Sequence, residues 1–213
     1  MDQEIIDIAL RSIMISGFAT VFASLWSIPL SYLLANKPRL AKTIIPFFEA
    51  LVGIPTVLVG LLLYMVLSSR GPLGFLGILY TPKAIIIGQA ILITPLITSI
   101  SYRVLRQSSE VFGELALSLG ASREQAMIIV LRESMPGIMT SIIMGFSRAI
   151  GELGVALMVG GNIKGYTRVL TTAIALEVSR GEFENAILLG LLLVLVMVLI
   201  SASLRVLKRF SEY

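Results

Sequence analysis

The feature that most constrains this chain is an uncharged run of nineteen residues, AILLGLLLVLVMVLISASL, at positions 186–204. A helix that crosses the hydrocarbon core of a bilayer needs about 20 mostly apolar residues. Four other stretches approach that length, and the five predicted spans are 8–34, 44–67, 84–102, 137–159 and 186–204. Only 14% of the residues are charged, whereas soluble domains carry about 25%. The sequence therefore predicts an all-α integral membrane protein with five transmembrane helices in one domain, 1–213.

The distribution of basic residues predicts how these spans are oriented. Five spans place the two termini on opposite sides, and Lys and Arg near the span ends favour the cytoplasm. One side would carry ten such residues, in the 35–43 loop, the 103–136 segment and the tail, and the other side would carry six. An acidic start argues against a cleaved signal peptide, which begins with basic residues. We expect a multi-pass protein of the cell membrane with its N-terminus outside and its C-terminus inside.

Several residue types that carry chemistry are missing. The chain has no Cys and no His, which excludes disulfides, Cys/His metal sites and His-based catalytic triads. It also lacks the G-x-x-x-x-G-K-[ST] pattern that cradles nucleotide phosphates. We therefore expect no catalytic residue, no metal site, no cofactor and no nucleic-acid partner. Any energy for transport has to come from a partner protein or an ion gradient.

A polar segment, 106–136, separates the third and fourth predicted spans on the predicted cytoplasmic side. Its pattern predicts two short helices around a turn. Apolar residues recur every four positions over 110–119, Gly120 stands at a helix C-cap position, and Ser122 with Gln125 forms a capping box for the second helix.

This hairpin has two open interpretations. It is either an amphipathic element that lies on the inner membrane surface or a rigid knob that docks a cytoplasmic partner. The second interpretation needs a rigid, capped hairpin, because such a hairpin can transmit force and a flexible loop cannot. In both cases we expect Pro136 and Gly137 to separate its second helix from the fourth span.

Two opposite charges, Arg148 and Glu152, lie inside the fourth predicted span. A charge at that depth costs about 2.5–3.5 kcal/mol on insertion scales. Their i, i+4 spacing places both on one helix face, where they can pair. The pair either fixes helix packing or lines a translocation path, and the sequence leaves both interpretations open.

Prolines interrupt two of the spans. Pro55 lies in the second span and Pro95 in the third, with Thr94 beside Pro95. Proline removes a backbone donor and bends a helix, and the carbonyl that it frees needs a hydroxyl or water as a new partner. These positions are either ordinary kinks or hinge points of a gate.

The segment that follows the fourth span is rich in glycine and carries two cations. Its candidate residues are Gly161, Asn162, Lys164 and Arg168. Backbone donors and two cations could capture a dianion. The alternative is a positioned loop that contacts a docked extracytoplasmic protein. Further along, we expect a short helix over 171–180 that packs back against the bundle.

Glu114, Ala116 and Gly120 fit the EAA-type pattern, a Glu-Ala-Ala run with Gly six positions after the Glu, except that Leu115 replaces the middle Ala. In this pattern the chain resembles the permease subunits of type I ATP-binding-cassette importers. That family inserts a coupling helix from this segment into a groove on its ATPase subunit. The resemblance assigns the ATPase contact here to Glu114, Ala116, Gly120, Ala121 and Ser122.

A subgroup resemblance covers nearly the whole chain. The stretches 60–82, 145–174 and 177–187 look like the oxyanion permeases for molybdate and tungstate, and RVLTTAI followed by LEVSRGEFE resembles the tungstate type. In the family's later Ile-x-Leu-Pro element, Arg132 and Glu133 replace Leu and Pro, which points to a subgroup. The resemblance implies a homodimer, two cytoplasmic ATPase subunits that bind ATP and Mg²⁺, and an extracytoplasmic oxyanion-binding protein.

The expected function is ATP-driven import of a tetrahedral oxyanion, tungstate by resemblance, through alternating access in the homodimer. Molybdate or sulfate transport is the alternative within the class. An ion-coupled secondary transporter or a channel is the alternative outside it. Secondary carriers tend to show inverted repeats and paired membrane acids. We find no repeat, and Glu152 is the only acid deep in a predicted span, which favours the importer.

Overall fold

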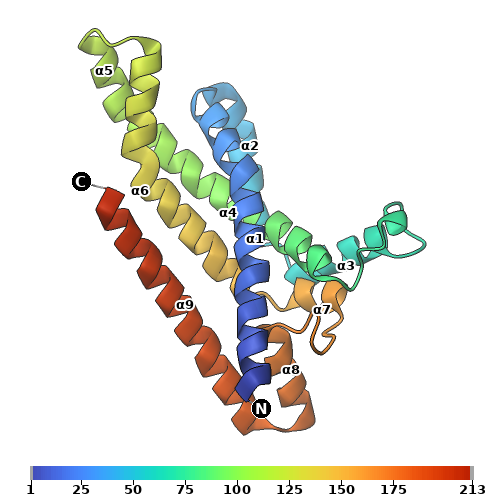
Figure 1. Ribbon diagram of the computed structural model, residues 1–213. Helices are drawn as coiled ribbons and strands as arrows, with labels where there is room; N and C mark the ends of the chain where they lie inside the picture. The colour runs from blue at the N-terminus through green and yellow to red at the C-terminus, as the bar shows by residue number, and fades with distance from the viewer. Residues whose placement is uncertain (1, 212–213) are drawn as a thin grey trace.

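The computed structural model describes residues 2–211, with side chains described for residues 3–203. Within this part of the chain every regular element is helical. Figure 1 shows α1 (Asp2–Ala35), α6 (Arg123–Ile150) and α9 (Phe183–Ser211) running along the length of the molecule, with α4 (Pro82–Ser108) crossing α1. Long helices satisfy their own backbone hydrogen bonds, which a lipid environment requires.

The expected fold class is confirmed. The first, third and fifth predicted spans lie within α1, α4 and α9. Among the residues that the structure describes, four helical runs are long and apolar enough to cross a membrane, and a bent helix pair makes a fifth if the two halves count as one span. Their orientation in the bilayer stays a prediction. Three basic residues of the tail on which it partly rests, Arg205, Lys208 and Arg209, lie outside the described side chains.

The second predicted span is not one straight helix. It divides into α2 (Pro38–Leu51) and α3 (Thr56–Leu67), which meet at an angle of 97°. Pro55 is the N-cap residue of α3 and not a kink inside a helix. The residue before a proline disfavours helical backbone, and Gly53 adds freedom, so the helix ends and restarts here.

The prediction that Pro136 separates a hairpin helix from the fourth span is wrong. α6 runs without interruption from Arg123 to Ile150 with Pro136 inside it. The carbonyl that loses its partner belongs to Arg132, an exposed residue, where water can replace the missing bond. The predicted end of this span at residue 159 is also wrong, because α6 stops at Ile150 and a separate helix, α7 (Gly154–Gly160), follows.

The hairpin between the third and fourth spans is made from the ends of two long helices. α4 continues through a π-helical turn, η2 (Ser109–Gly113), into α5 (Glu114–Ser118), and α6 returns after a tight turn. The hairpin projects beyond the other helices at one end of the molecule (Figure 1). This shape does not match an amphipathic element lying flat on a membrane surface.

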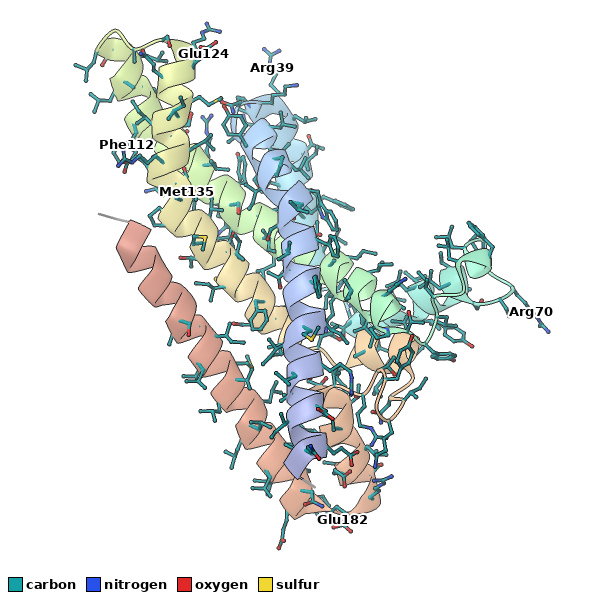
Figure 2. The ribbon with its side chains drawn as sticks, viewed as in Figure 1. Arg39, Arg70, Phe112, Glu124, Met135 and Glu182 are labelled. Carbon is teal, nitrogen blue, oxygen red and sulfur yellow. The ribbon has the colours of Figure 1, made fainter. Side chains whose placement is uncertain are left out.

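Two features complete the fold, one at the other end of the molecule and one at its side. The predicted short helix over 171–180 is confirmed as α8 (Leu170–Arg180), whose Leu170 and Ala173 pack with Leu189 of α9 and Ile8 of α1. Between α3 and α4 the chain forms a lobe with a short 3-10 helix, η1 (Gly74–Leu76). Figure 2 shows Arg70 at the tip of this lobe, to the side of the bundle.

The core of the bundle lies where α1, α4 and α6 meet. Ala19 and Ala23 of α1 pack against Ala90 of α4 and Ala149 of α6, and all four are buried. Small residues let helix backbones approach closely where lipid gives no hydrophobic driving force. The close approach of α4 and α6 fixes where the C-terminal end of α6 lies.

Gly145→Val should destabilise this contact, because a Cβ at Gly145 would lie 2.7 Å from Cδ1 of Ile97. We expect a loss of about 1–3 kcal/mol, typical of extra methyl groups forced into a packed interface. Gly190→Val in α9 is the matched control, since nothing lies within 4 Å of its Cβ position. Thermal unfolding in detergent should show a lower Tm for Gly145→Val only. Equal Tm values would contradict the close packing of α4 and α6.

Candidate functional site

Two interruptions of membrane helices lie side by side. The first, residues 52–55, precedes α3, and the second, residues 151–153, precedes α7. A Cβ on Gly154 would lie 2.6 Å from Oγ1 of Thr56 and 2.9 Å from the backbone nitrogen of Val57. Only glycine permits this approach, so the first turns of α3 and α7 are in direct backbone contact.

The predicted ion pair forms at the second interruption. Nη1 of Arg148 donates to Oε2 of Glu152 at 2.8 Å. The Glu152 side chain is 2% exposed, whereas that of Arg148 is 39% exposed. The expectation that both residues lie inside a helix is wrong, since Glu152 follows the end of α6 at Ile150. The pair therefore joins the last turn of α6 to the interruption itself.

Glu152 also connects three elements. Its Oε1 accepts a hydrogen bond from the backbone N–H of Val155 at 3.2 Å, in the first turn of α7. Its backbone carbonyl accepts one from Oγ1 of Thr171 in α8 at 2.8 Å. A carboxylate near the start of a helix satisfies a free donor and interacts favourably with the helix dipole. Glu152 thus holds α6, α7 and α8 together at the interruption.

A buried glutamine that the sequence analysis missed lies beside this pair. Nε2 of Gln89 in α4 donates to the carbonyl of Ala149 at 2.9 Å. Ala149 is in the last turn of α6, where helix carbonyls lack intrahelical partners. The sequence does contain an indication of this role, since Gln89 is the only amide side chain within the third predicted span. Gln89 contributes a further tie between α4 and the end of α6.

Residues at both interruptions are exposed on the surface of the single chain. Val52, Gly53 and Pro55 are exposed at the first, and Gly151 and Leu153 at the second. In hydrocarbon, irregular backbone is tolerated only where protein covers it or where it lines a water-filled cavity. The face that carries both interruptions is therefore suited to protein or water and not to lipid.

The second predicted proline site differs from the first. Pro95 is buried inside α4, which continues through it. Oγ1 of Thr94 donates to the carbonyl of Ala90 at 2.7 Å and accepts a hydrogen bond from Nε1 of Trp26 at 2.8 Å. α1 therefore packs against this site. The structure separates Pro95 and Thr94, at a helix–helix contact, from Pro55, at an interruption.

The predicted coupling residues lie on the first arm of the hairpin, α5, and at its tip. Gly120 has a φ of +88°, and the capping box of Ser122 and Gln125 is present in both directions. Glu114 is exposed and Ala116 is buried. Leu119 is 79% exposed, so the tip presents apolar as well as charged surface.

The hairpin tip lies at the same end of the molecule as the basic 35–43 loop. Figure 2 shows Glu124 of the hairpin and Arg39 at one end, and Glu182 at the opposite end. The prediction of a loop over 35–43 is wrong in part, because α2 already begins at Pro38 and includes Arg39. The predicted orientation also placed the hairpin and this loop on one side of the membrane.

The predicted outer turn has carboxylate partners of its own. Gly161 and Asn162 adopt positive φ values of 69° and 51°. Nζ of Lys164 lies 3.0 Å from Oε2 of Glu4, and Nη1 of Arg168 lies 3.8 Å from Oε1 of the same carboxylate. The Arg168 side chain also donates to Oδ1 of Asn162 at 3.2 Å. Because Glu4 already pairs with both cations and offsets one of their two charges, the geometry favours a positioned loop over an anion-capturing turn.

Comparison with known proteins gives consistent matches. Residues 27–212 match the family model described as "Binding-protein-dependent transport system inner membrane component". The chain is 39% identical to the tungstate uptake system permease protein TupB of Peptoclostridium acidaminophilum, over 94% of this chain and 89% of that protein. It is 33% identical to a probable anion ABC transporter permease protein of Haloferax volcanii, over 89% and 84%.

A solved structure has the same fold. The crystal structure of an amino acid ABC transporter with histidines superimposes with a TM-score of 0.62, covering 98% of this chain and 94% of that chain. Its sequence identity is 14%, so this likeness concerns the fold alone.

Replacing Arg148 or Glu152 should reveal their coupling. Arg148→Ala leaves a buried carboxylate without its cation, and we expect a loss of about 3 kcal/mol, low for a buried pair because Arg148 is partly exposed. Glu152→Ala should cost about 1–2 kcal/mol, since the guanidinium can turn to water. The double variant should cost less than the sum of the two. Unfolding in detergent measures all three.

A second ion pair serves as the control for this comparison of single and double variants. Arg103 and Glu49 are 2.7 Å apart and exposed, and such surface pairs contribute about 0–1 kcal/mol. Strict additivity for Arg148 and Glu152 would show that their contact does not stabilise the protein.

Proposed function

Because the chain belongs to the family of binding-protein-dependent transport system inner membrane components, we propose that it is the permease subunit of an ATP-driven oxyanion importer, with tungstate as its substrate. The similarity to a tungstate uptake permease over 94% of the chain supports the substrate. The structural observation that supports a translocation role is the pair of adjacent helix interruptions beside the partly exposed Arg148. The protein is a multi-pass component of the inner membrane.

A homodimer would cover the interrupted face. Residues 52–55 and 151–153 need protein or water around their backbone, and a second copy with a water-filled path between the two chains supplies both. α1 and α9 instead present long, uninterrupted apolar surfaces that suit lipid. We therefore propose that the interrupted faces of two copies meet across the path, with the Arg148–Glu152 pairs beside it.

The charge arrangement suits passage of an anion better than its retention. Arg148 supplies a cation to the path, and its salt bridge to Glu152 at 2.8 Å offsets most of that charge. A dianion would therefore meet a local cation and backbone dipoles without a site of high affinity. Tight binding within the path would slow release, so selection of the oxyanion belongs mainly to the binding protein.

α6 gives a direct mechanical link between the hairpin and the path. Its 28 residues span about 42 Å at 1.5 Å per residue. One end begins at the Ser122 cap in the hairpin tip, and the other ends beside Glu152. The proposed cycle is alternating access: two partner ATPases bind ATP and Mg²⁺, their closure moves the hairpins together, and the two permease copies change from inward-open to outward-open.

Other members of the same class remain the alternative. Molybdate and sulfate are tetrahedral dianions, and the same weak path would pass them. An ion-coupled secondary transporter is less consistent with the buried Glu152, because Arg148 and Val155 hold its carboxylate oxygens.

Uptake by a reconstituted complex tests the function. Proteoliposomes that contain this chain, its co-purifying ATPase and the oxyanion-binding protein should accumulate tungstate only with ATP. Molybdate and sulfate, offered singly, test the alternatives. Omitting the ATPase is the control. Accumulation driven by an ion gradient without ATP would contradict the proposed class.

Gly120→Val tests the coupling hairpin. The positive φ of Gly120 would strain a β-branched residue by about 1–3 kcal/mol or re-aim the start of α6. The matched control is Gly165→Val, because Gly165 also has a positive φ and open space around it. Gly120→Val should weaken ATPase pull-down or stop substrate-stimulated ATP hydrolysis while the permease still inserts and dimerises.

Glu114→Ala should change coupling in the same direction, since Glu114 lies exposed on the first arm of the hairpin. Normal ATPase binding and normal stimulation in both Gly120→Val and Glu114→Ala would exclude the hairpin as the site of coupling.

A further inference from the structure

The base of the coupling hairpin contains a π-helical turn. α4 ends at Ser108, the π-helix η2 covers Ser109–Gly113, and α5 starts at Glu114 without a gap. A π turn holds one more residue than an α turn, is rare, and occurs frequently at functional sites. An uninterrupted α-helix would present α5 in a different register. Contacts from neighbouring elements therefore have to hold this wider turn in place.

Arg106 makes two such contacts, which link three elements. Its Nη2 lies 2.6 Å from Oε1 of Glu110 inside the π turn. Its Nη1 donates to the carbonyl of Ala35 at 3.3 Å. Ala35 is the last residue of α1, where carbonyls lack helical partners and the helix dipole favours a cation. One guanidinium therefore connects the end of α1, the end of α4 and the π turn.

The other side of the π turn packs against α6. Gly113 is buried, and a Cβ there would lie 3.2 Å from Cγ2 of Val130. Arg106, Glu110, Gly113 and Val130 line one groove of about 490 Å³ under the hairpin. The two arms of the hairpin thus meet at the π turn, and Arg106 is the contact that leads from there to α1.

We propose that Arg106 is a positioning residue for energy coupling. It holds the π turn in register and fixes the hairpin to the cytoplasmic end of α1, so that movement of the hairpin reaches the membrane helices. This inference rests on the proposed function of the hairpin. The pair with Glu110 is partly exposed and adds little to stability, so its loss changes the position of the hairpin and not the folding of the bundle.

A distance measurement in the isolated permease tests the positioning directly. The chain has no cysteine, so spin labels on Leu119→Cys at the hairpin tip and Leu33→Cys in α1 are unique. Both side chains are exposed. Arg106→Gln should broaden or shift the distance distribution between the two labels. Arg103→Gln is the matched control: Arg103 lies on the same helix and also pairs with a carboxylate, Glu49 at 2.7 Å, but does not contact the hairpin base. It should leave the distribution unchanged.

Coupling in the reconstituted complex gives the functional readout. Arg106→Gln should bind the ATPase normally but transport several-fold fewer anions per ATP hydrolysed. Glu110→Gln should lower that ratio less, because the bond to Ala35 remains. Arg106→Lys should give a ratio between those of Arg106→Gln and the unsubstituted complex. The lysine ammonium keeps the positive charge but lacks the several fixed donors with which the guanidinium bonds two partners at once.

Three results would overturn the inference. These are an unchanged distance distribution in Arg106→Gln, equal coupling ratios for Arg106→Gln and Arg103→Gln, and loss of ATPase binding in Arg106→Gln, which would make Arg106 a docking residue. Failure of the proposed function has a different signature, because the unsubstituted complex itself would then show no ATP-dependent uptake.

Discussion

Backbone hydrogen bonding in a solvent without hydrogen-bonding partners is the constraint on which this structure depends. α1, α4, α6 and α9 meet it internally, because long helices pair their own N–H and C=O groups. At the interruptions, 52–55 and 151–153, short-range turn bonds replace the helical pattern and satisfy part of the backbone. Glu152 supplies one acceptor to the start of α7, and the remaining exposed backbone requires protein or water. This requirement distinguishes the interrupted face from the lipid-facing helices.

The pairing of cationic side chains with carboxylates follows from the same low-dielectric environment. A lone cation along the path would bind a dianion strongly and hold it. Arg148 is instead paired with Glu152, and at the outer turn Lys164 is paired with Glu4. Arg148 remains accessible enough to attract an anion, while Glu152 lowers the net charge. In the proposed path this arrangement would discriminate weakly between anions, in line with the proposal that specificity resides in a separate binding protein.

Continuity of the helices gives the proposed coupling between the hairpin and the translocation path a structural basis. The hairpin is not a separate module, since α4 passes through the π turn into its first arm and α6 forms its second. α6 alone connects the Ser122 cap to the Arg148–Glu152 pair. A rigid connection of this kind moves as a unit, and the sites that can adjust its angle are the positive-φ Gly120 and the π turn beside Arg106.

The sequence alone determined what depends on composition and on neighbours along the chain: the uncharged span 186–204, the capping box at Ser122 and the positive φ of Gly120. These features need only a local hydrogen bond, a local backbone preference or a solvent preference. Tertiary structure decided that α3 turns through 97° after Pro55, that Glu152 lies beyond the end of α6, and that α6 continues through residue 136. These outcomes depend on the tertiary surroundings of each break. Gln89 of α4 and Thr171 of α8 bond the end of α6 and the interruption that follows it, and water can reach the exposed carbonyl that Pro136 frees.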